Sequence, residues 1–241
     1  MRISRIFSSQ TLAHSKEILL DKDTSHYVMH VLRLKTDDAV ILFDGSGYDY
    51  SAVIMATSRN GVQVKVQEHV FINKESPLKI HLGQVIAKGE KMDLILQKSV
   101  ELGVNEITPL FSQRCDVKLP KDRIDKKMAH WQAIIISACE QSGRSFLPKL
   151  HTPIAWEDWA RDLTSEIKLI LHPANKSALS KLQVTSAALL VGPEGGFSTD
   201  ETEQAIQYGF QSWTIGPRIL RTETAALVGI SLLQAKWGDY T

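Results

Sequence analysis

Cysteine and long apolar runs are both scarce in this chain of 241 residues. The two cysteines, Cys115 and Cys139, cannot form a disulfide framework, and neither belongs to a CxxC pair. We therefore expect a protein of the reducing cytoplasm. No run of about 18 or more uncharged apolar residues is present, and the first residues lead into no apolar segment of a secretory signal. The sequence predicts neither a membrane span nor export.

An excess of charge of one sign is also missing, since 28 basic side chains face 27 acidic ones and the formal net charge is +1. This balance gives no general indication of nucleic-acid binding. Basic residues are concentrated locally, in residues 114–127. Such a run is more typical of a solvated helix face than of a phosphate-binding surface.

Several common catalytic motifs are absent. Neither GxGxxG nor GxxxxGK[ST] follows a predicted strand, which argues against a nicotinamide enzyme and a P-loop enzyme. The absence of HExxH, of a Cys/His cluster and of GxSxG removes support for a zinc site and for a hydrolase nucleophile elbow. His26 and His30 have the i, i+4 spacing of helical metal ligands, but no third ligand lies near them in the sequence. We expect no metal cofactor.

The predicted secondary structure changes at residues 73–77, and this change divides the chain. Upstream, Val62, Val64 and Val66 alternate with polar residues, as in a half-buried antiparallel strand. With a predicted hairpin and one short helix, this pattern indicates a small β-barrel or sandwich over residues 1–72. Downstream, short apolar segments alternate with amphipathic helices, as in a parallel sheet covered on both faces. The predicted fold class is therefore α/β, with a β domain at 1–72 and an α/β domain at 73–241.

Two loops with special backbone chemistry follow segments that we expect to be buried strands. Residues 192–198, GPEGGFS, follow one apolar run, and residues 216–224, GPRILRTET, follow the last predicted strand. Ligands of open α/β sheets bind outside the carboxyl ends of the strands, where both loops are expected. Glycine also lets backbone groups approach a ligand closely. One such loop is equally well explained as a turn, but the pair predicts a ligand site.

These two loops resemble the signature segments of the RsmE family, the 16S ribosomal RNA uridine-N3 methyltransferases of the SPOUT, or α/β-knot, superfamily. The resemblance extends over nearly the whole chain. Further matching segments are His26-Tyr27 and residues 31–33, 42–47, 88–93, 97–98, 101–104 and 140–144. Ile215 and Cys115 are minor departures from the family pattern. Agreement in so many separated segments makes the resemblance specific.

The resemblance implies a PUA-like, RNA-binding β-barrel in residues 1–72 and a SPOUT domain with a deep trefoil knot in residues 73–241. The usual rules for chain connections argue against a knot by default. The resemblance also implies a homodimer that uses S-adenosylmethionine (SAM) as methyl donor and needs no metal. The implied substrate is 16S ribosomal RNA in the assembled small ribosomal subunit.

By resemblance, ten residues are expected to contact SAM: Leu171, His172, Val191, Gly192, Pro193, Glu194, Gly195, Ile215, Gly216 and Leu220. The expected reaction also assigns roles at the second loop. N3 of uridine is a weak nucleophile while protonated, so the enzyme must position the base and promote loss of its proton. Arg221 can stabilise the N3 anion, and Glu223 is a candidate general base. An interaction of Glu223 with the dipole of the following helix explains that residue equally well.

Contacts with RNA are expected at basic side chains in or near the matching segments: Arg2, Arg5, His26, Arg33 and Lys88. Two other functions stay open from the sequence: a SPOUT methyltransferase that acts on another RNA, and an RNA-binding dimer without catalysis. The intact loops with Arg221 favour an enzyme, and the N-terminal segments favour ribosomal RNA.

Overall fold

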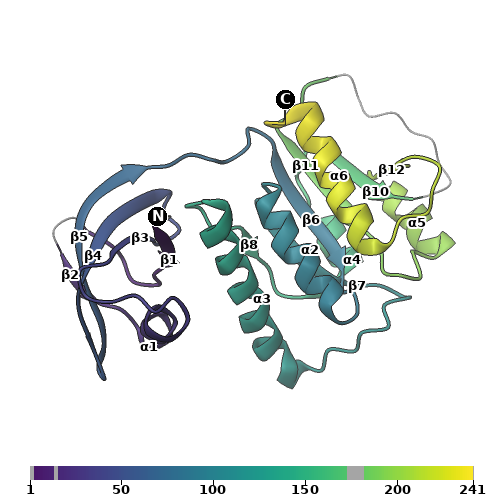
Figure 1. Ribbon diagram of the computed structural model, residues 1–241. Helices are drawn as coiled ribbons and strands as arrows, with labels where there is room; N and C mark the ends of the chain where they lie inside the picture. Colours follow the sequence, from purple (N-terminus) through teal and green to yellow (C-terminus); the bar gives the residue numbers. More distant parts are fainter. Residues whose placement is uncertain (1–2, 14–15, 173–181, 241) are drawn as a thin grey trace. The chain divides into compact units, whose positions relative to one another are not determined.

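The computed structural model describes residues 3–13, 16–172 and 182–240, so Arg2 lies outside the described residues (Figure 1). The chain divides into two compact units. The first unit contains the chain up to Glu75 together with Cys139–Leu147, and the second contains Ser76–Ala138 and the chain from Pro148 onwards. The division expected at residues 72 and 73 did not include this returning segment, Cys139–Leu147.

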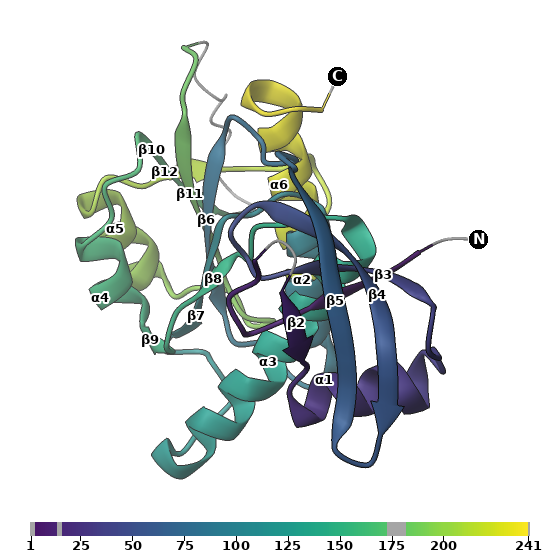
Figure 2. The same ribbon diagram turned by 90° about the vertical axis from the view of Figure 1, so that its left-hand side faces the viewer.

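The first unit is built on a five-stranded sheet in the order β1-β3-β4-β5-β2 (Figure 2). Its strands are β1 (Ser4–Phe7), β2 (Glu17–Leu19), β3 (Ala39–Phe43), β4 (Tyr48–Ser58) and β5 (Gly61–Phe71). β1 pairs with β3 in parallel, and the other pairs are antiparallel. Val62, Val64 and Val66 are fully buried while Gln63 and Lys65 are exposed, which confirms the predicted alternation.

One helix connects β2 to β3. Helix α1 (Lys22–His26) continues as a π-helical turn over Tyr27–Val31. The carboxylate of Asp21 caps α1, because it accepts hydrogen bonds from the backbone N–H and the hydroxyl of Thr24 at 2.9 and 2.8 Å. The one short helix predicted for this domain is therefore present, and it begins at Lys22.

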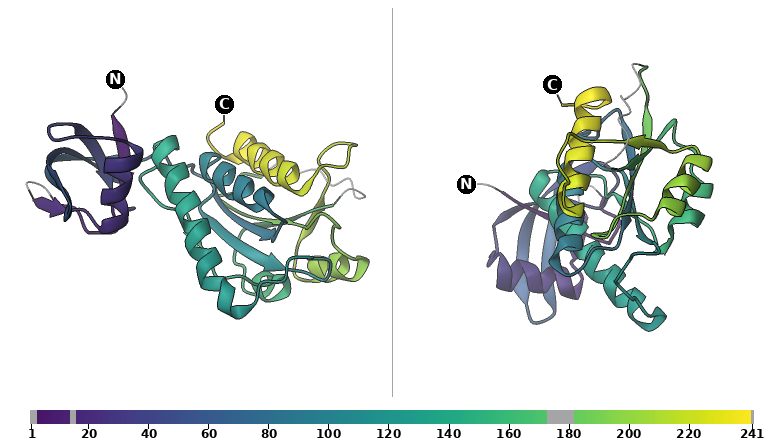
Figure 3. Two further views of the ribbon diagram at one scale, coloured as in Figure 1. Left: turned by 60° about the horizontal axis from the view of Figure 1, so that its bottom comes forward. Right: turned by 90° about the vertical axis from the view of Figure 1, so that its right-hand side faces the viewer.

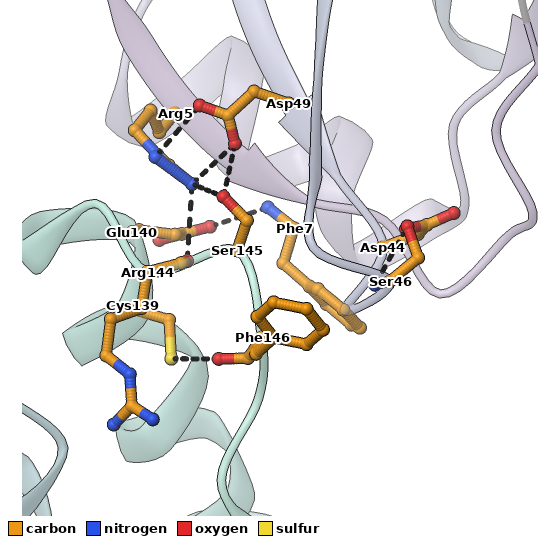
Figure 4. Close-up of polar contacts among 10 residues, drawn as sticks. All are labelled: Arg5, Phe7, Asp44, Ser46, Asp49, Cys139, Glu140, Arg144, Ser145 and Phe146. Atoms are coloured by element: carbon orange, nitrogen blue, oxygen red, sulfur yellow. Dashed lines mark hydrogen bonds and ion pairs between the residues drawn. The ribbon is translucent and has the colours of Figure 1, made fainter. Parts of the chain in front are cut away.

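Polar contacts explain why the returning segment belongs to the first unit (Figure 4). Arg5 donates hydrogen bonds to both carboxylate oxygens of Asp49, at 3.0 and 3.2 Å, and to the hydroxyl of Ser145 at 3.2 Å. Glu140 accepts a hydrogen bond of 3.0 Å from the backbone N–H of Phe7 on the edge strand β1. The returning segment therefore satisfies polar groups of β1 that no neighbouring strand pairs.

The second unit contains a parallel sheet in the order β12-β10-β11-β6-β7-β8, with β9 also paired to β7. Its strands are β6 (Lys79–Val85), β7 (Glu106–Phe111), β8 (Lys149–Leu150), β9 (Ile154–Ala155), β10 (Ile167–Leu171), β11 (Ser186–Val191) and β12 (Gln211–Trp213). Every strand pair of this sheet in the described part of the chain is parallel. The predicted parallel sheet is confirmed.

Helices cover both faces of this sheet (Figure 3). One face carries α2 (Glu90–Glu101) and α6 (Thr222–Trp237), and the other carries α4 (Trp156–Arg161) and α5 (Thr199–Gln207). Helix α3 (Lys121–Ser142) begins in the second unit and ends in the returning segment. Within the described ranges, no helix combines the length and the apolar character needed to cross a membrane.

Candidate functional site

The carboxyl ends of β11, β10 and β12, which are neighbouring strands, meet at one edge of the second unit's sheet. Residues 192–198 follow β11, His172 follows β10, and residues 214–221 lead from β12 to α6. Because these strands are parallel, the two loops and His172 lie together. This is the edge at which the sequence predicted a ligand site.

Two adjoining cavities open among these loops. The larger has a volume of about 660 Å³ and is lined mainly by residues 191–197 and 219–222. The smaller has a volume of about 100 Å³ and is lined mainly by residues 213–216 and 218–220. The larger volume lies within the range of roughly 300–1,000 Å³ that is usual for small-molecule sites.

All ten residues that were expected to contact the cofactor line these cavities. Val191, Gly192, Pro193, Glu194 and Gly195 line the larger cavity, Ile215 and Gly216 line the smaller one, and Leu171, His172 and Leu220 line both. The fold therefore brings three separate segments of the sequence to one place.

Hydrogen bonds between the loops fix their relative positions. The hydroxyl of Thr222 donates to the carbonyl oxygen of Gly192 over 2.6 Å and accepts from the side-chain amide of Gln84 over 3.0 Å. At the other loop, the hydroxyl of Thr214 donates to the carbonyl oxygen of His172 over 2.7 Å. Gln84 is completely buried near the end of β6, so this network reaches from the core to the cavity wall.

Glycine gives the loop backbone its shape. Gly196 and Gly216 have φ angles of +65° and +70°, a left-handed conformation that other residues adopt only with strain. A Cβ atom added at either position would meet no atom within 4 Å. Beyond the loop, the side chains of Ser198 and Glu201 form a capping box that begins α5.

Glu194 is the carboxylate of the larger cavity, and nearby donors hold it ionised. Lys91 Nζ lies 2.9 Å from its Oε1, to which the backbone N–H of Lys88 also donates over 3.4 Å. Burial acts to raise the pKa of Glu194, but hydrogen bonds from Lys91 and from backbone N–H groups outweigh it and hold the pKa below its ordinary value. Glu194 is therefore a poor proton acceptor at neutral pH.

The two candidate catalytic residues are placed differently. Arg221 is exposed, precedes the first turn of α6 and lines the larger cavity. Glu223 is not among the described residues that line either cavity. Its Oε2 atom is buried and makes no hydrogen bond to any described residue. Since Glu223 lies in the first turn of α6, the helix dipole favours its negative charge.

The residues expected to contact RNA fall into two groups. In the first unit, His26 and Arg33 are exposed, whereas the side chain of Arg5 is only 11% exposed and its guanidinium is bound to Asp49 and to the returning segment. Arg5 therefore stabilises the first unit, and few of its N–H donors are left to bind a phosphate. In the second unit, Lys88 is exposed and forms an ion pair of 2.8 Å with an aspartate, Asp116.

Sequence reasoning missed three residues that support the site: Gln84, Lys91 and Arg114. Arg114 lines the larger cavity and donates hydrogen bonds to the carbonyl oxygens of Gly195 and Phe197, at 3.1 and 3.3 Å, and so supports the first loop. Weak signals existed in the sequence. Gln84 is a polar residue within an apolar run, Lys91 lies in the matching segment 88–93, and Arg114 begins the basic run 114–127.

Comparisons with known proteins agree across the whole chain. Residues 74–234 match the family model of an RNA methyltransferase domain, and residues 20–67 match that of an RNA methyltransferase PUA domain. The chain is 42% identical to the ribosomal RNA small subunit methyltransferase E of Buchnera aphidicola (subspecies Schizaphis graminum), over 99% of this chain and 98% of that protein.

Solved structures of methyltransferases are also similar to the whole chain. A Legionella pneumophila methyltransferase, determined with the bound cofactor SAM, has a TM-score of 0.97 and 41% identity, with both chains completely covered. A ribosomal RNA small subunit methyltransferase E from Neisseria gonorrhoeae, bound to SAM, has a TM-score of 0.92 and 37% identity, again with complete coverage of both chains.

Proposed function

The chain belongs to the ribosomal RNA small subunit methyltransferase E family, and from that premise we propose that it transfers the methyl group of SAM to N3 of a uridine in 16S ribosomal RNA. The observation that carries this proposal is the meeting of two loops and the end of β10 at one sheet edge, where all ten expected cofactor residues line two adjoining cavities. The comparisons with known proteins confirm the resemblance of the sequence to the RsmE family.

The loops fit SAM by their shape and chemistry. The open space beside the backbone of Gly196 and Gly216 leaves room for a ligand to lie against the loops. Leu171 and Leu220 offer apolar surface, and the loop backbone offers polar groups, which is the usual composition of a small-molecule site. When bound, SAM supplies a methyl group activated by a positively charged sulfur atom.

The remaining chemistry concerns the uridine, and we assign it to Arg221. A uridine N3 atom attacks readily only after it has lost its proton, so a positive charge beside O2 or O4 lowers the barrier. Arg221 is the exposed cation at the start of α6 that lines the larger cavity. The low pKa of Glu194 makes it a weak candidate for the base, and Glu223 is kept as the candidate whose test follows below.

A homodimer is part of the proposal, and helix α6 supports it. No charged residue occurs between Glu223 and Lys236, so the helix is apolar on nearly every side. A helix of this kind is normally covered all round. Leu232 on α6 and Leu94 on α2 are nevertheless 41% and 40% exposed. A second copy of the chain would bury these side chains.

We also propose that the second unit contains a trefoil knot, because of the path that the chain takes after β12. Strand β12 lies at the edge of the sheet, yet the helix that follows it packs against β11 and α2. The loop between β12 and α6 is tied to the end of β10 by the hydrogen bonds at His172, whose backbone N–H also donates to the carbonyl oxygen of Trp213 over 3.1 Å. Residues 173–181 lie outside the described residues.

The first unit is proposed to contact 16S ribosomal RNA in the assembled small ribosomal subunit, in the cytoplasm. His26, His30 and Arg33 are exposed on α1 and the turn after it, and the two imidazole rings lie 4.5 Å apart. Basic and aromatic groups of this kind bind phosphates and unpaired bases.

Mapping of modified nucleosides tests the proposed function. Mass spectrometry of 16S ribosomal RNA from cells that lack the gene should show one uridine without the methyl group found in the parent strain. Wild-type protein should restore the modification, and Arg221→Ala should not. A methyl group lost from another RNA would support the alternative substrate, and unchanged RNA would support a binding protein without catalysis. Purified small subunits and protein-free 16S ribosomal RNA, compared as substrates, distinguish the assembled particle from the RNA alone.

A further inference from the structure

A third cavity, of about 630 Å³, lies at the opposite edge of the second unit's sheet. It is lined by residues at the amino ends of strands, among them His81 in β6, Glu106 in β7 and Ser186 in β11. The proposed SAM cavities lie at the carboxyl ends of the parallel strands. This third cavity is therefore separate from the site of methyl transfer, and the proposed reaction assigns it no role.

Three potential metal ligands meet in this cavity: His81, Glu106 and His151. One nitrogen or oxygen atom from each lies within 4.8 Å of the corresponding atoms of the other two. His81 and Glu106 are register partners on adjacent strands, so their side chains share one face of the sheet. His151 follows β8, which pairs with the start of β7. The fold itself thus collects the group from three neighbouring strands.

The two imidazole rings are oriented for a shared partner. They lie nearly parallel, with centroids 5.2 Å apart and an angle of 24° between their planes. Nε2 of His151 lies 2.6 Å from Oε2 of Glu106. Asp162 and Asp158 line the same cavity, and Asp158 is paired with Arg161. Two imidazoles and a carboxylate form a donor set that divalent transition metals favour.

Neighbouring side chains hold the ring of His81 in place in the metal-free protein. Nε2 of His81 lies 2.8 Å from the hydroxyl of Thr108 and accepts a hydrogen bond of 3.0 Å from the indole N–H of Trp159. Trp159 can approach only because residue 83 is glycine: a Cβ atom there would lie 2.4 Å from the indole ring. The position of His81 is therefore fixed by its surroundings.

We propose that His81, Glu106 and His151 bind one divalent transition-metal ion of the Zn²⁺ class, which joins β6, β7 and the segment after β8. Three protein ligands leave a fourth position that opens into the cavity. The ion stabilises the sheet at this edge and takes no part in methyl transfer.

The contact between Trp159 and His81 gives the proposal a specific consequence. An indole N–H can only donate, so Nε2 of His81 carries a lone pair in the metal-free protein. A metal at Nε2 would use that lone pair. A metal at Nδ1 would leave the proton of the neutral ring on Nε2, where it would face the hydroxyl of Thr108. In both cases the Trp159 hydrogen bond is lost when the ion binds.

The test uses the full-length protein after treatment with a chelator. Calorimetric titration with Zn²⁺ should show one site, and Co²⁺ should give the visible absorption of a nitrogen- and oxygen-coordinated ion. His151→Gln and Glu106→Gln should each weaken binding at least about tenfold. His130→Gln is the matched control, because His130 forms a surface pair of 2.8 Å with Asp93 and belongs to no group of three potential ligands among the described residues.

A second readout needs no ligand variant. On saturation with Zn²⁺, the indole N–H resonance of Trp159, assigned by comparison with Trp159→Phe, should move as its hydrogen bond is lost. The proposal would be overturned if the wild type had no Zn²⁺ site. It would also be overturned if the His151 and Glu106 variants bound Zn²⁺ as tightly as the wild type, or if the Trp159 resonance did not move. The cluster would then be a hydrogen-bonded group with a structural role alone.

Discussion

The hydroxyl of Thr222 donates a hydrogen bond of 2.6 Å to the carbonyl oxygen of Gly192. The same hydroxyl accepts a hydrogen bond from the buried amide of Gln84. Thr222 begins α6, Gly192 follows β11, and Gln84 belongs to β6. One buried hydroxyl thus joins three elements at the edge where we place the cofactor.

Replacing Thr222 by valine keeps the shape of the side chain but removes the hydroxyl. The amide of Gln84 and the carbonyl of Gly192 then lose a buried partner, which costs roughly 1–3 kcal/mol. We expect Thr222→Val to lower both the melting temperature and the affinity for SAM, measured by calorimetry. Thr222→Ser retains the hydroxyl and should stay close to wild type. Wild-type SAM affinity in a folded Thr222→Val protein would contradict this role for the network.

A branched side chain at Gly195 should block the larger cavity without disturbing the fold. Gly195 is exposed, and a Cβ atom there would lie 3.5 Å from Arg114, an ordinary contact. We expect Gly195→Val to weaken SAM binding at least about tenfold, or ~1.4 kcal/mol, with a nearly unchanged melting temperature. Gly195→Ala should have a smaller effect. Unchanged affinity in both variants would mean that the cofactor lies elsewhere.

Removal of Arg221 should impair methyl transfer far more than cofactor binding. The proposed contact with the uracil anion strengthens towards the transition state, and groups of this kind contribute about 10²–10³-fold. Arg221→Ala should therefore lower kcat/KM by roughly 100-fold while the Kd for SAM stays within about threefold. Equal losses in the two quantities would make Arg221 a cofactor ligand instead.

Glu223→Gln is the companion variant in the same assay. Because Glu223 is not among the described residues that line the cavities, we expect most activity to be retained between about pH 6 and 9. A large loss that depends on pH would identify Glu223 as the base.

Arg5 and Arg33 should differ in what their replacement affects. Arg5→Met removes a bidentate ion pair with Asp49 and two contacts to the returning segment, so it should destabilise the first unit by about 2–3 kcal/mol. Arg33→Glu alters an exposed side chain and should lower RNA affinity and flatten its salt dependence without a change in melting temperature. Binding titrations at several salt concentrations and thermal unfolding separate the two effects. If Arg33→Glu left RNA affinity unchanged, residues 114–127 would become the preferred RNA-binding surface.

Cys139 should be unreactive in the folded protein. Burial raises the pKa of its thiol to about 12, so almost no thiolate is present at pH 8. Alkylation followed by mass spectrometry should label Cys139 only in denaturant or at strongly alkaline pH. Because the unfolded chain loses this proton first, the thiol also makes the folded state less stable as the pH rises from about 9 towards 12. Fast labelling of Cys139 at pH 8 would show that the returning segment opens readily.

The sequence by itself determined those features that depend on neighbouring residues. The alternation of Val62, Val64 and Val66 predicted a half-buried strand, and the spacing of Ser198 and Glu201 is that of a capping box, which marks the start of α5. Both patterns involve residues only a few positions apart in the sequence, so they can be recognised without knowledge of the fold. The matching segments identified the family in the same way, because their residues are contiguous.

The tertiary structure alone decided which distant residues meet. Arg114 supports the carbonyl of Gly195, Cys139–Leu147 joins the first unit, and His81, Glu106 and His151 gather at one sheet edge. None of these groupings has a period or a spacing, since each joins residues that lie far apart along the chain, and the group of His81, Glu106 and His151 depends on the order of the strands. In a parallel sheet, that order brings together ends of strands that lie far apart along the chain, and this is why the supporting residues could be found only in the folded protein.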